Sequence, residues 1–136
     1  MNTNFTNGRI TRTDTPIIYK ELSYTIIEAC MEVHTILGPG FTEKLYEEAV
    51  IREIAMRSIA FERQKLIEVF YKGDKIGEYR LDIVVDNKII LELKAVSDMN
   101  STFEAQLFSY LKATNMKLGI LLNFGKKKLE FKRIVN

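Results

Sequence analysis

The stretch from Arg80 to Ala95, which reads RLDIVVDNKIILELKA, constrains the fold more than any other part of the chain. It alternates, is rich in Val and Ile, and has one polar Asp-Asn break, so it predicts two antiparallel strands joined by a tight turn. Three charged residues, Asp82, Glu92 and Lys94, fall inside these apolar strands. A charge in a half-buried strand is costly unless it is paired or binds a metal. These three residues therefore form the first candidate for a functional site.

The spacing of these charges restricts how the two strands pair. Glu92 and Lys94 share one face of their strand, roughly 6.6 Å apart along the chain, and Leu93 points to the other face. A carboxylate and an ammonium can therefore converge on one ligand. Asp82 joins them only if it lies opposite Glu92, which centres the connection on Asn87 and requires an odd loop or a bulge. We predict that odd loop or bulge, because a two-residue turn would place Asp82 on the wrong face.

Composition limits the class of protein without naming a function. The chain has 136 residues, of which 46% are hydrophobic and 28% charged, as in an ordinary soluble domain. A net charge of +2 neither supports nor excludes nucleic-acid binding. Cys30 is the single cysteine, which excludes an internal disulfide framework and fits a reducing cytoplasm. We find no run of membrane-spanning length and no secretory signal, so we expect a cytoplasmic protein.

The order of predicted elements indicates an α/β fold. Residues 1–16 are rich in Asn and Thr and predict a mobile tail, and residues 17–136 predict one domain. Helical or alternating spacing then predicts helices at 20–37 and 42–57, strands at 66–71, 76–85 and 88–95, a helix at 101–113, and strands at 118–123 and 129–135. This α-α-β-β-β-α-β-β order predicts a mixed sheet flanked by helices.

The helices carry specific expectations about burial and capping. Apolar spacing predicts that these side chains are buried: Leu22, Ile26, Ala29, Val33 and Ile36 in the first helix, and Leu45, Ala49, Val50 and Ile54 in the second. Thr42 is a suitable N-cap for the second helix, and Ser101 with Glu104 predicts a capping box for the third. Gln106 and Tyr110 are four apart and share a face of the third helix.

The spacing of Asp82 followed by Glu92-Leu93-Lys94 resembles the signature of the PD-(D/E)XK nuclease superfamily. The α-β-β-β-α-β order resembles the restriction-endonuclease-like core of that superfamily. A closer resemblance is to the GxxExxY family, whose pattern is present as Gly40-Phe41-Thr42-Glu43-Lys44-Leu45-Tyr46. Other segments that look like that family are Gly38 to Gly40, Phe61 to Gln64, Gly77 to Arg80, Glu92 to Ala95, and Asn123 to Gly125. The similarity runs from Leu22 onward and implies a small stand-alone nuclease domain.

The resemblance assigns roles to the central charged residues, and chemistry gives reasons for those roles. Phosphodiester hydrolysis needs an activated water and neutralisation of phosphoryl charge, both of which a hard divalent cation supplies. Asp82, Glu92 and the Leu93 carbonyl are expected to bind Mg²⁺ or Mn²⁺, which prefer oxygen ligands. Lys94 is expected to orient the water or to offset charge in the transition state.

The resemblance also implies supporting residues, each with a simpler explanation. Glu43 is expected to bind a second metal ion or a water of the first, although an acid in the first turn of a helix also needs no function. Gln106 and Tyr110 are expected to position Lys94, the water or a phosphate, or they only pack on the sheet. His34 is a further candidate metal ligand, against an ordinary packing role.

The leading hypothesis is therefore a metal-dependent nuclease that acts on nucleic acid, and we favour DNA over RNA as its substrate although the sequence does not distinguish the two. The first alternative is a catalytically silent module that binds nucleic acid or a protein, and the second is a domain acting on another phosphorylated ligand. Lys126 to Lys128, with Lys112 and Lys117, could follow a phosphate backbone or form a solvated surface. With no separate reader motif, specificity would come from the cleft, a homo-oligomer or a protein partner.

Overall fold

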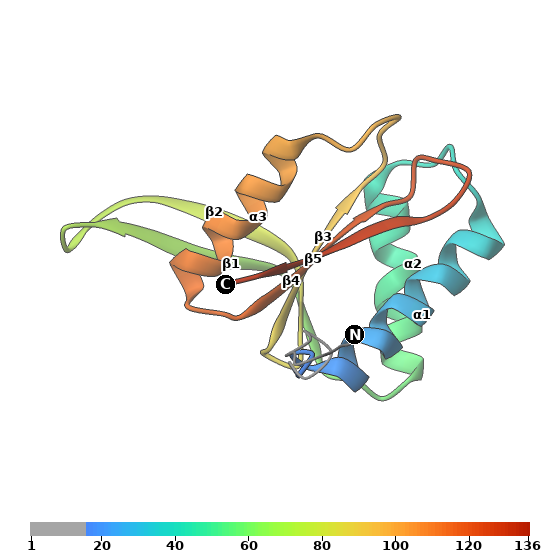
Figure 1. The fold of residues 1–136 in the computed structure, drawn as a ribbon, viewed down its shortest axis with the longest axis horizontal. Coiled ribbons are helices and arrows are strands. Elements are labelled where there is room, and N and C mark those ends of the chain that lie inside the picture. Colours follow the sequence, from blue (N-terminus) through green and yellow to red (C-terminus); the bar gives the residue numbers. More distant parts are fainter. Residues whose placement is uncertain (1–15) are drawn as a thin grey trace, which may run out of the picture.

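A computed structural model describes residues 16–136, arranged as three helices and five strands (Figure 1). The tail predicted at 1–16 lies, apart from Pro16, outside the described residues. The elements are α1 (Lys20–Leu37), α2 (Glu43–Met56), β1 (Phe61–Tyr71), β2 (Asp74–Val85), β3 (Ile89–Lys94), α3 (Ser101–Thr114), β4 (Leu118–Asn123) and β5 (Glu130–Val135). Among the helices of this described part, none has the length and apolar content needed to cross a bilayer.

The strands form one mixed sheet in the order β1-β2-β3-β4-β5. Strands β3 and β4 are parallel, and every other neighbouring pair is antiparallel. The parallel pair is joined through α3, as a crossover connection requires. Helices α1 and α2 cover one face of the sheet and α3 covers the other (Figure 1). The predicted α/β class and element order are confirmed.

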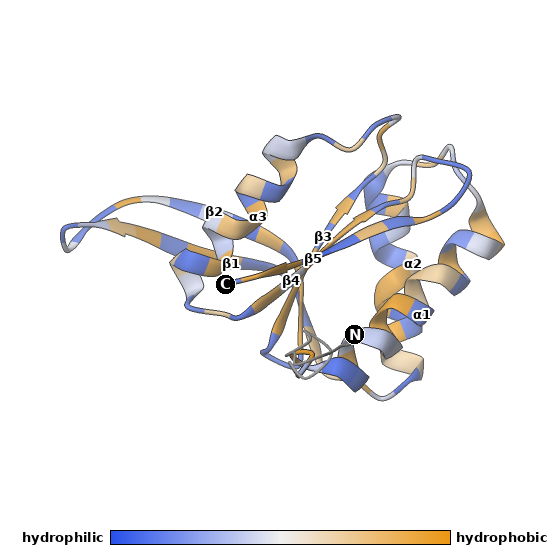
Figure 2. Cartoon of the chain, viewed as in Figure 1, coloured by the Kyte–Doolittle hydropathy of each residue, from blue (hydrophilic) through white to orange (hydrophobic). Residues whose placement is uncertain are grey.

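Apolar side chains fill the space on both faces of the sheet. The larger cluster lies between the sheet and the two N-terminal helices and includes Ile26, Tyr46 and Leu93. The smaller cluster lies under α3, where Leu107 packs so closely on β4 that a Cβ at Gly119 would come within 2.8 Å of it. Figure 2 shows apolar residues concentrated in the central strands. The two cores fix the ends of β3, which is buried on both sides.

Four local predictions were wrong. Ile36 and Leu45 are 67% and 42% exposed. In α2, Tyr46 packs into the core in place of Leu45, and its ring stacks on Phe124 at 4.7 Å between centroids. The N-cap of α3 is Asn100, whose side chain accepts a hydrogen bond from Thr102 N–H, so the cap lies one residue before the predicted one.

The fourth difference is the start of β1, which begins at Phe61, five residues before the predicted position. Its first part, Phe61 to Lys65, pairs with the buried end of β2 although three of its residues are polar and exposed. Edge strands need no strict alternation because one side faces solvent. This first part of β1, which was not predicted as a strand, places polar side chains beside Asp82.

Strand β2 is twice as long as β3, with 12 residues against 6. Their pairing covers only Ile83 to Val85 with Ile89 to Leu91. Beyond Ile83, β2 leaves β3 and continues with β1 as a two-stranded arm that projects from the sheet (Figure 1). The separation of β2 from β3 begins at Asp82.

Candidate functional site

The hairpin between β2 and β3 has the odd connection that the charge spacing requires. Val85 pairs with Ile89, so three residues, 86 to 88, lie between the paired positions. Asp86 and Asn87 both adopt left-handed backbone conformations, with φ of 51° and 55°. The same register continued outward sets Asp82 opposite Glu92. The predicted odd loop is confirmed.

Asp82 and Glu92 lie where the two strands separate, and their side chains replace the missing backbone contacts. The Glu92 carboxylate accepts a hydrogen bond from Asp82 N–H at 3.2 Å. The Asp82 carboxylate accepts one from Leu93 N–H at 2.9 Å. Each acid is therefore tied to the backbone of the opposite strand, which holds the two carboxylates close together.

These two acids carry more negative charge than their surroundings neutralise. Glu92 is 7% exposed, and burial, followed by the charge of Asp82, raises its pKa to about 8. Burial also raises the pKa of Asp82, against the opposing effect of the Leu93 hydrogen bond. Within residues 16–136, neither side chain accepts a hydrogen bond from an arginine or a lysine. The pair thus lacks a positive partner.

Lys94 lies on the face predicted from the strand alternation. Leu93 enters the core under α1 and α2, whereas the Lys94 ammonium lies over the Phe103 ring of α3, 4.4 Å from its centroid. A cation is attracted to the face of an aromatic ring. The charge of Lys94 lowers the pKa of Asp82 and of Glu92 without neutralising either. The ammonium is therefore close enough to the acids to affect their pKa values, while its direct contact is with Phe103.

Glu43 opens α2 and is exposed. Its charge raises the pKa of both Asp82 and Glu92, so it contributes to the same negative region. A cleft of about 670 Å³ joins it to Asp82, and its remaining lining residues are Lys44, Glu47, Arg63 and Gln64. The structure thus brings Glu43 together with the central acids.

Four residues that line this cleft were not predicted as site residues from the sequence: Lys44, Glu47, Arg63 and Gln64. Glu47, which is 8% exposed, accepts hydrogen bonds from Arg63 Nη2 at 3.2 Å and Gln64 Nε2 at 3.0 Å. Gln64 has a left-handed backbone with φ of 52° and lies opposite Asp82 in the ladder. Glu47 could have been found, because it shares a helix face with Glu43 four residues earlier. Arg63 and Gln64 belong to the segment Phe61 to Gln64, which resembles the GxxExxY family, but that resemblance did not assign them to the site.

The predicted α3 residues lie differently with respect to the acids. Tyr110 is 6% exposed and contacts Tyr79 with 5.0 Å between ring centroids. Burial, then the charge of Glu92, raises the Tyr110 pKa to about 12, which places this tyrosine beside the acid pair. Gln106 is exposed, although it shares a helix face with the buried Tyr110.

His34 is buried and lies against a different loop. Its Nε2 is 2.8 Å from the Lys126 carbonyl oxygen, so this nitrogen donates to the loop that follows β4. It lines a separate pocket with Lys127 and Lys128. The structure does not bring His34 into the cleft of Asp82.

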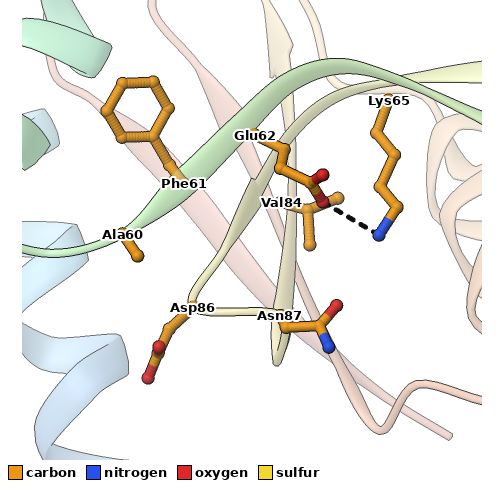
Figure 3. Close-up of a pocket in the computed structure, with 7 residues that line it drawn as sticks. All are labelled: Ala60, Phe61, Glu62, Lys65, Val84, Asp86 and Asn87. Atoms are coloured by element: carbon orange, nitrogen blue, oxygen red, sulfur yellow. Dashed lines mark ion pairs between the residues drawn. The ribbon is translucent and has the colours of Figure 1, made fainter.

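A further hollow of about 420 Å³ lies at the turn end of the β2–β3 hairpin (Figure 3). Glu62 and Lys65 form an ion pair across it at 2.9 Å, and Asp86 and Asn87 close one side (Figure 3). None of the predicted site residues lines it. The cleft lined by Glu43 and Asp82, with Glu92 beside Asp82, is therefore the candidate site.

A sequence model of the PD-(D/E)XK nuclease superfamily matches residues 20–134. The chain belongs to the PD-(D/E)XK nuclease superfamily. The crystal structure of SSO0001 is similar in fold, with a TM-score of 0.56, 20% sequence identity and coverage of 88% of this chain. This chain spans 58% of the length of that one. A comparison with curated proteins gives no match.

The donor set fits a divalent cation of the kind that PD-(D/E)XK nucleases typically use. Two carboxylates with unneutralised charge, and the carbonyl of the residue between Glu92 and Lys94, are hard oxygen donors. Within the described residues, no three His, Cys, Asp or Glu side chains form a complete metal cage. An ion that keeps several water ligands, as Mg²⁺ does, suits such a sparse site.

Proposed function

We propose that this protein is a metal-dependent nuclease that hydrolyses phosphodiester bonds of nucleic acid, with DNA as the expected substrate. One observation carries the proposal: Asp82 and Glu92 face each other across separating strands, and their burial is not balanced by a cationic side chain. Buried carboxylates without a counter-charge are costly for folding, so a site that keeps two of them favours a ligand that carries positive charge.

Asp82, Glu92 and the Leu93 carbonyl would hold Mg²⁺ or Mn²⁺. Such an ion supplies an acidified water and offsets negative charge on the phosphoryl group. Glu43 extends the acidic surface from the start of α2 and would help to hold a second ion or a water molecule. Both acids would then be ionised, because a bound cation favours the carboxylate over the protonated form.

Lys94 provides the positive charge of the chain at the reacting centre. In hydrolysis, a water oxygen forms a bond to phosphorus, the bond to the leaving ester oxygen breaks, and the water loses a proton. The Lys94 ammonium would orient that water or stabilise the charge that develops on the phosphoryl oxygens. Phe103 holds the ammonium by its ring, which prevents it from forming a tight ion pair with the acids.

The loop after β4 would guide the nucleic-acid backbone. Lys94 pairs with Asn123 in the parallel ladder, so Lys126 to Lys128 follow at the same end of the sheet as the acids. Lys126 is partly neutralised by Glu130 at 3.3 Å, which leaves Lys127 and Lys128 as the stronger phosphate ligands. Lys117 precedes β4 and lies at its opposite end, so it would not share this track. Sequence or structure specificity would come from the cleft, a second copy or a protein partner.

The test is Mn²⁺ binding measured by calorimetry for the wild type and for Asp82→Asn, followed by incubation of both with single-stranded, double-stranded and branched DNA and with RNA. We expect binding and metal-dependent cleavage by the wild type and neither by the variant. Glu53→Gln is the matched control, because Glu53 pairs with Arg57 and does not line the cleft. Absence of metal binding by the wild type, with nucleic acid present, would favour the catalytically silent module.

A further inference from the structure

We infer that Arg63 is the phosphate-binding residue of the acid cleft and that Glu47 and Glu48 hold its guanidinium in place for this purpose. The inference rests on the proposed nuclease function and extends it to the residue that binds a backbone phosphate beside the reacting one. A guanidinium suits this role because its planar N–H groups match two phosphate oxygens at once.

The position of Arg63 supports a substrate contact. It pairs with Ile83 in the β1–β2 ladder, one residue from Asp82, and lines the same cleft as Asp82 and Glu43. Its side chain is 39% exposed. A polyanion that reaches the central acids therefore passes this guanidinium, whose charge offsets the repulsion from the carboxylates.

The hydrogen bonds of Arg63 leave part of its donor capacity for a ligand. Both of its side-chain bonds start from Nη2, one to Glu47 Oε2 at 3.2 Å and one to Glu48 Oε2. A guanidinium has five N–H donors. Among the described residues, Nη1 and Nε have no hydrogen-bond partner in the protein. Two carboxylates thus fix one edge of the group while its other N–H groups stay available.

Arg52 provides a comparison within the same cluster. It also binds Glu48, through Nη1 at 2.7 Å, but it lies one helical turn away on α2 with its side chain 68% exposed. It does not line the cleft. Arg52 therefore shares the partner and the charge of Arg63 and lacks its position, which makes it the matched control.

The test measures affinity for a fluorescent DNA oligonucleotide by anisotropy, in EDTA to prevent cleavage, over a series of salt concentrations. For Arg63→Gln we expect a roughly tenfold loss of affinity and a decrease of about one in the slope of log K against log salt, because one phosphate contact is lost. Arg52→Gln should keep the wild-type slope. Equal slopes for the two variants would overturn the inference.

A second measurement uses the unmodified protein, so that it does not depend on the folding of a variant. Bound oligonucleotide should protect Arg63, and not Arg52, from an arginine-specific dicarbonyl reagent, as read by mass spectrometry of peptides. Equal protection of both arginines would contradict the inference.

These experiments separate failure of this inference from failure of the proposed function. If the wild type binds no DNA or RNA, the nuclease proposal and the phosphate-binding role both fall. If the wild type binds and cleaves, while Arg63 stays unprotected and its removal leaves the salt slope unchanged, only the role of Arg63 falls.

Discussion

Two neighbouring groups of carboxylates lie in or beside the cleft, and they are neutralised in different ways. Glu48, at the edge of α2, accepts hydrogen bonds from Arg63 and a second arginine, which lower its pKa to about 2. Asp82 and Glu92 accept hydrogen bonds from backbone N–H groups, and burial raises the pKa of both. The pKa values of carboxylates in one region of the protein are therefore shifted in opposite directions.

The difference separates acids whose charge is neutralised by arginines from acids whose charge is not. The acids on α2 have their counter-charge within the chain, so they are complete in the folded protein. Asp82 and Glu92 lack such a counter-charge. Their negative charge is neutralised only when they bind a proton or a cation. Substitutions in either group of acids or in their partners test this distinction.

The largest effect is expected for Glu92→Gln. This substitution removes the more buried acid of the pair, so cleavage should fall by at least about 1000-fold. The melting temperature should stay the same or rise, because Gln is neutral, has nearly the shape of the protonated acid and cannot ionise in its buried position. A gel assay and thermal unfolding measure both quantities. Glu53→Gln, at a residue that pairs with Arg57 and does not line the cleft, should retain cleavage, and unfolding of the Glu92 variant would show that Glu92 is structural.

The stability of the metal-free protein should fall as pH rises from about 5 to 8. The Glu92 pKa is raised from 4.5 to about 8 in the folded protein, so in this range the folded state retains a proton that the unfolded state has lost. The loss should amount to a few kcal/mol and end near pH 8. Denaturant unfolding over this range measures it. Glu92→Gln should have a flatter profile, and Mg²⁺ should restore stability to the wild type at pH 8.

Lys94→Met should reduce cleavage by about 100-fold and leave Mn²⁺ binding intact. The ammonium contacts Phe103 and no carboxylate, so its loss removes transition-state charge rather than a metal ligand. Phe103→Leu should have a smaller effect, about tenfold, because the ammonium stays present and loses its position. Calorimetry and single-turnover rates distinguish the two steps. Loss of Mn²⁺ binding by either variant would contradict this assignment.

The smallest effect is expected for Glu48→Gln. The Glu48 side chain is exposed enough for water and salt to screen its ion pairs, so the melting temperature and the Mn²⁺ affinity should match those of the wild type within error. A marked loss of stability would mean that the balanced acids support the fold more strongly than the comparison implies.

Periodicity predicted much of the fold because it records local geometry. It placed α1 at 20–37 and β4 at 118–123, as observed, since helical spacing and a continuous apolar run need no knowledge of distant residues. The odd loop was also predictable, because alternation fixes which register brings Asp82 opposite Glu92. The centre of the site was thus available from spacing alone.

The surroundings of the site depend on packing between distant segments. Ile36 follows helical spacing and is still 67% exposed in the described part of the protein. Arg63 and Gln64 belong to a polar stretch that becomes a strand only by pairing with β2, and the left-handed backbone of Gln64 has no sequence signature. His34 looked like a metal ligand and instead donates to the Lys126 carbonyl.

Where β2 and β3 separate, two backbone N–H groups donate to side-chain carboxylates instead of to backbone carbonyls. These two amides can report the ionisation state of the acids. Asp82 N–H donates to the Glu92 carboxylate, and Leu93 N–H donates to the Asp82 carboxylate. The NMR chemical shifts of these two amides should therefore follow the ionisation of the acids directly. A pH titration with and without Mg²⁺, observed at two backbone signals, would read the charge state of the site before any substrate is known.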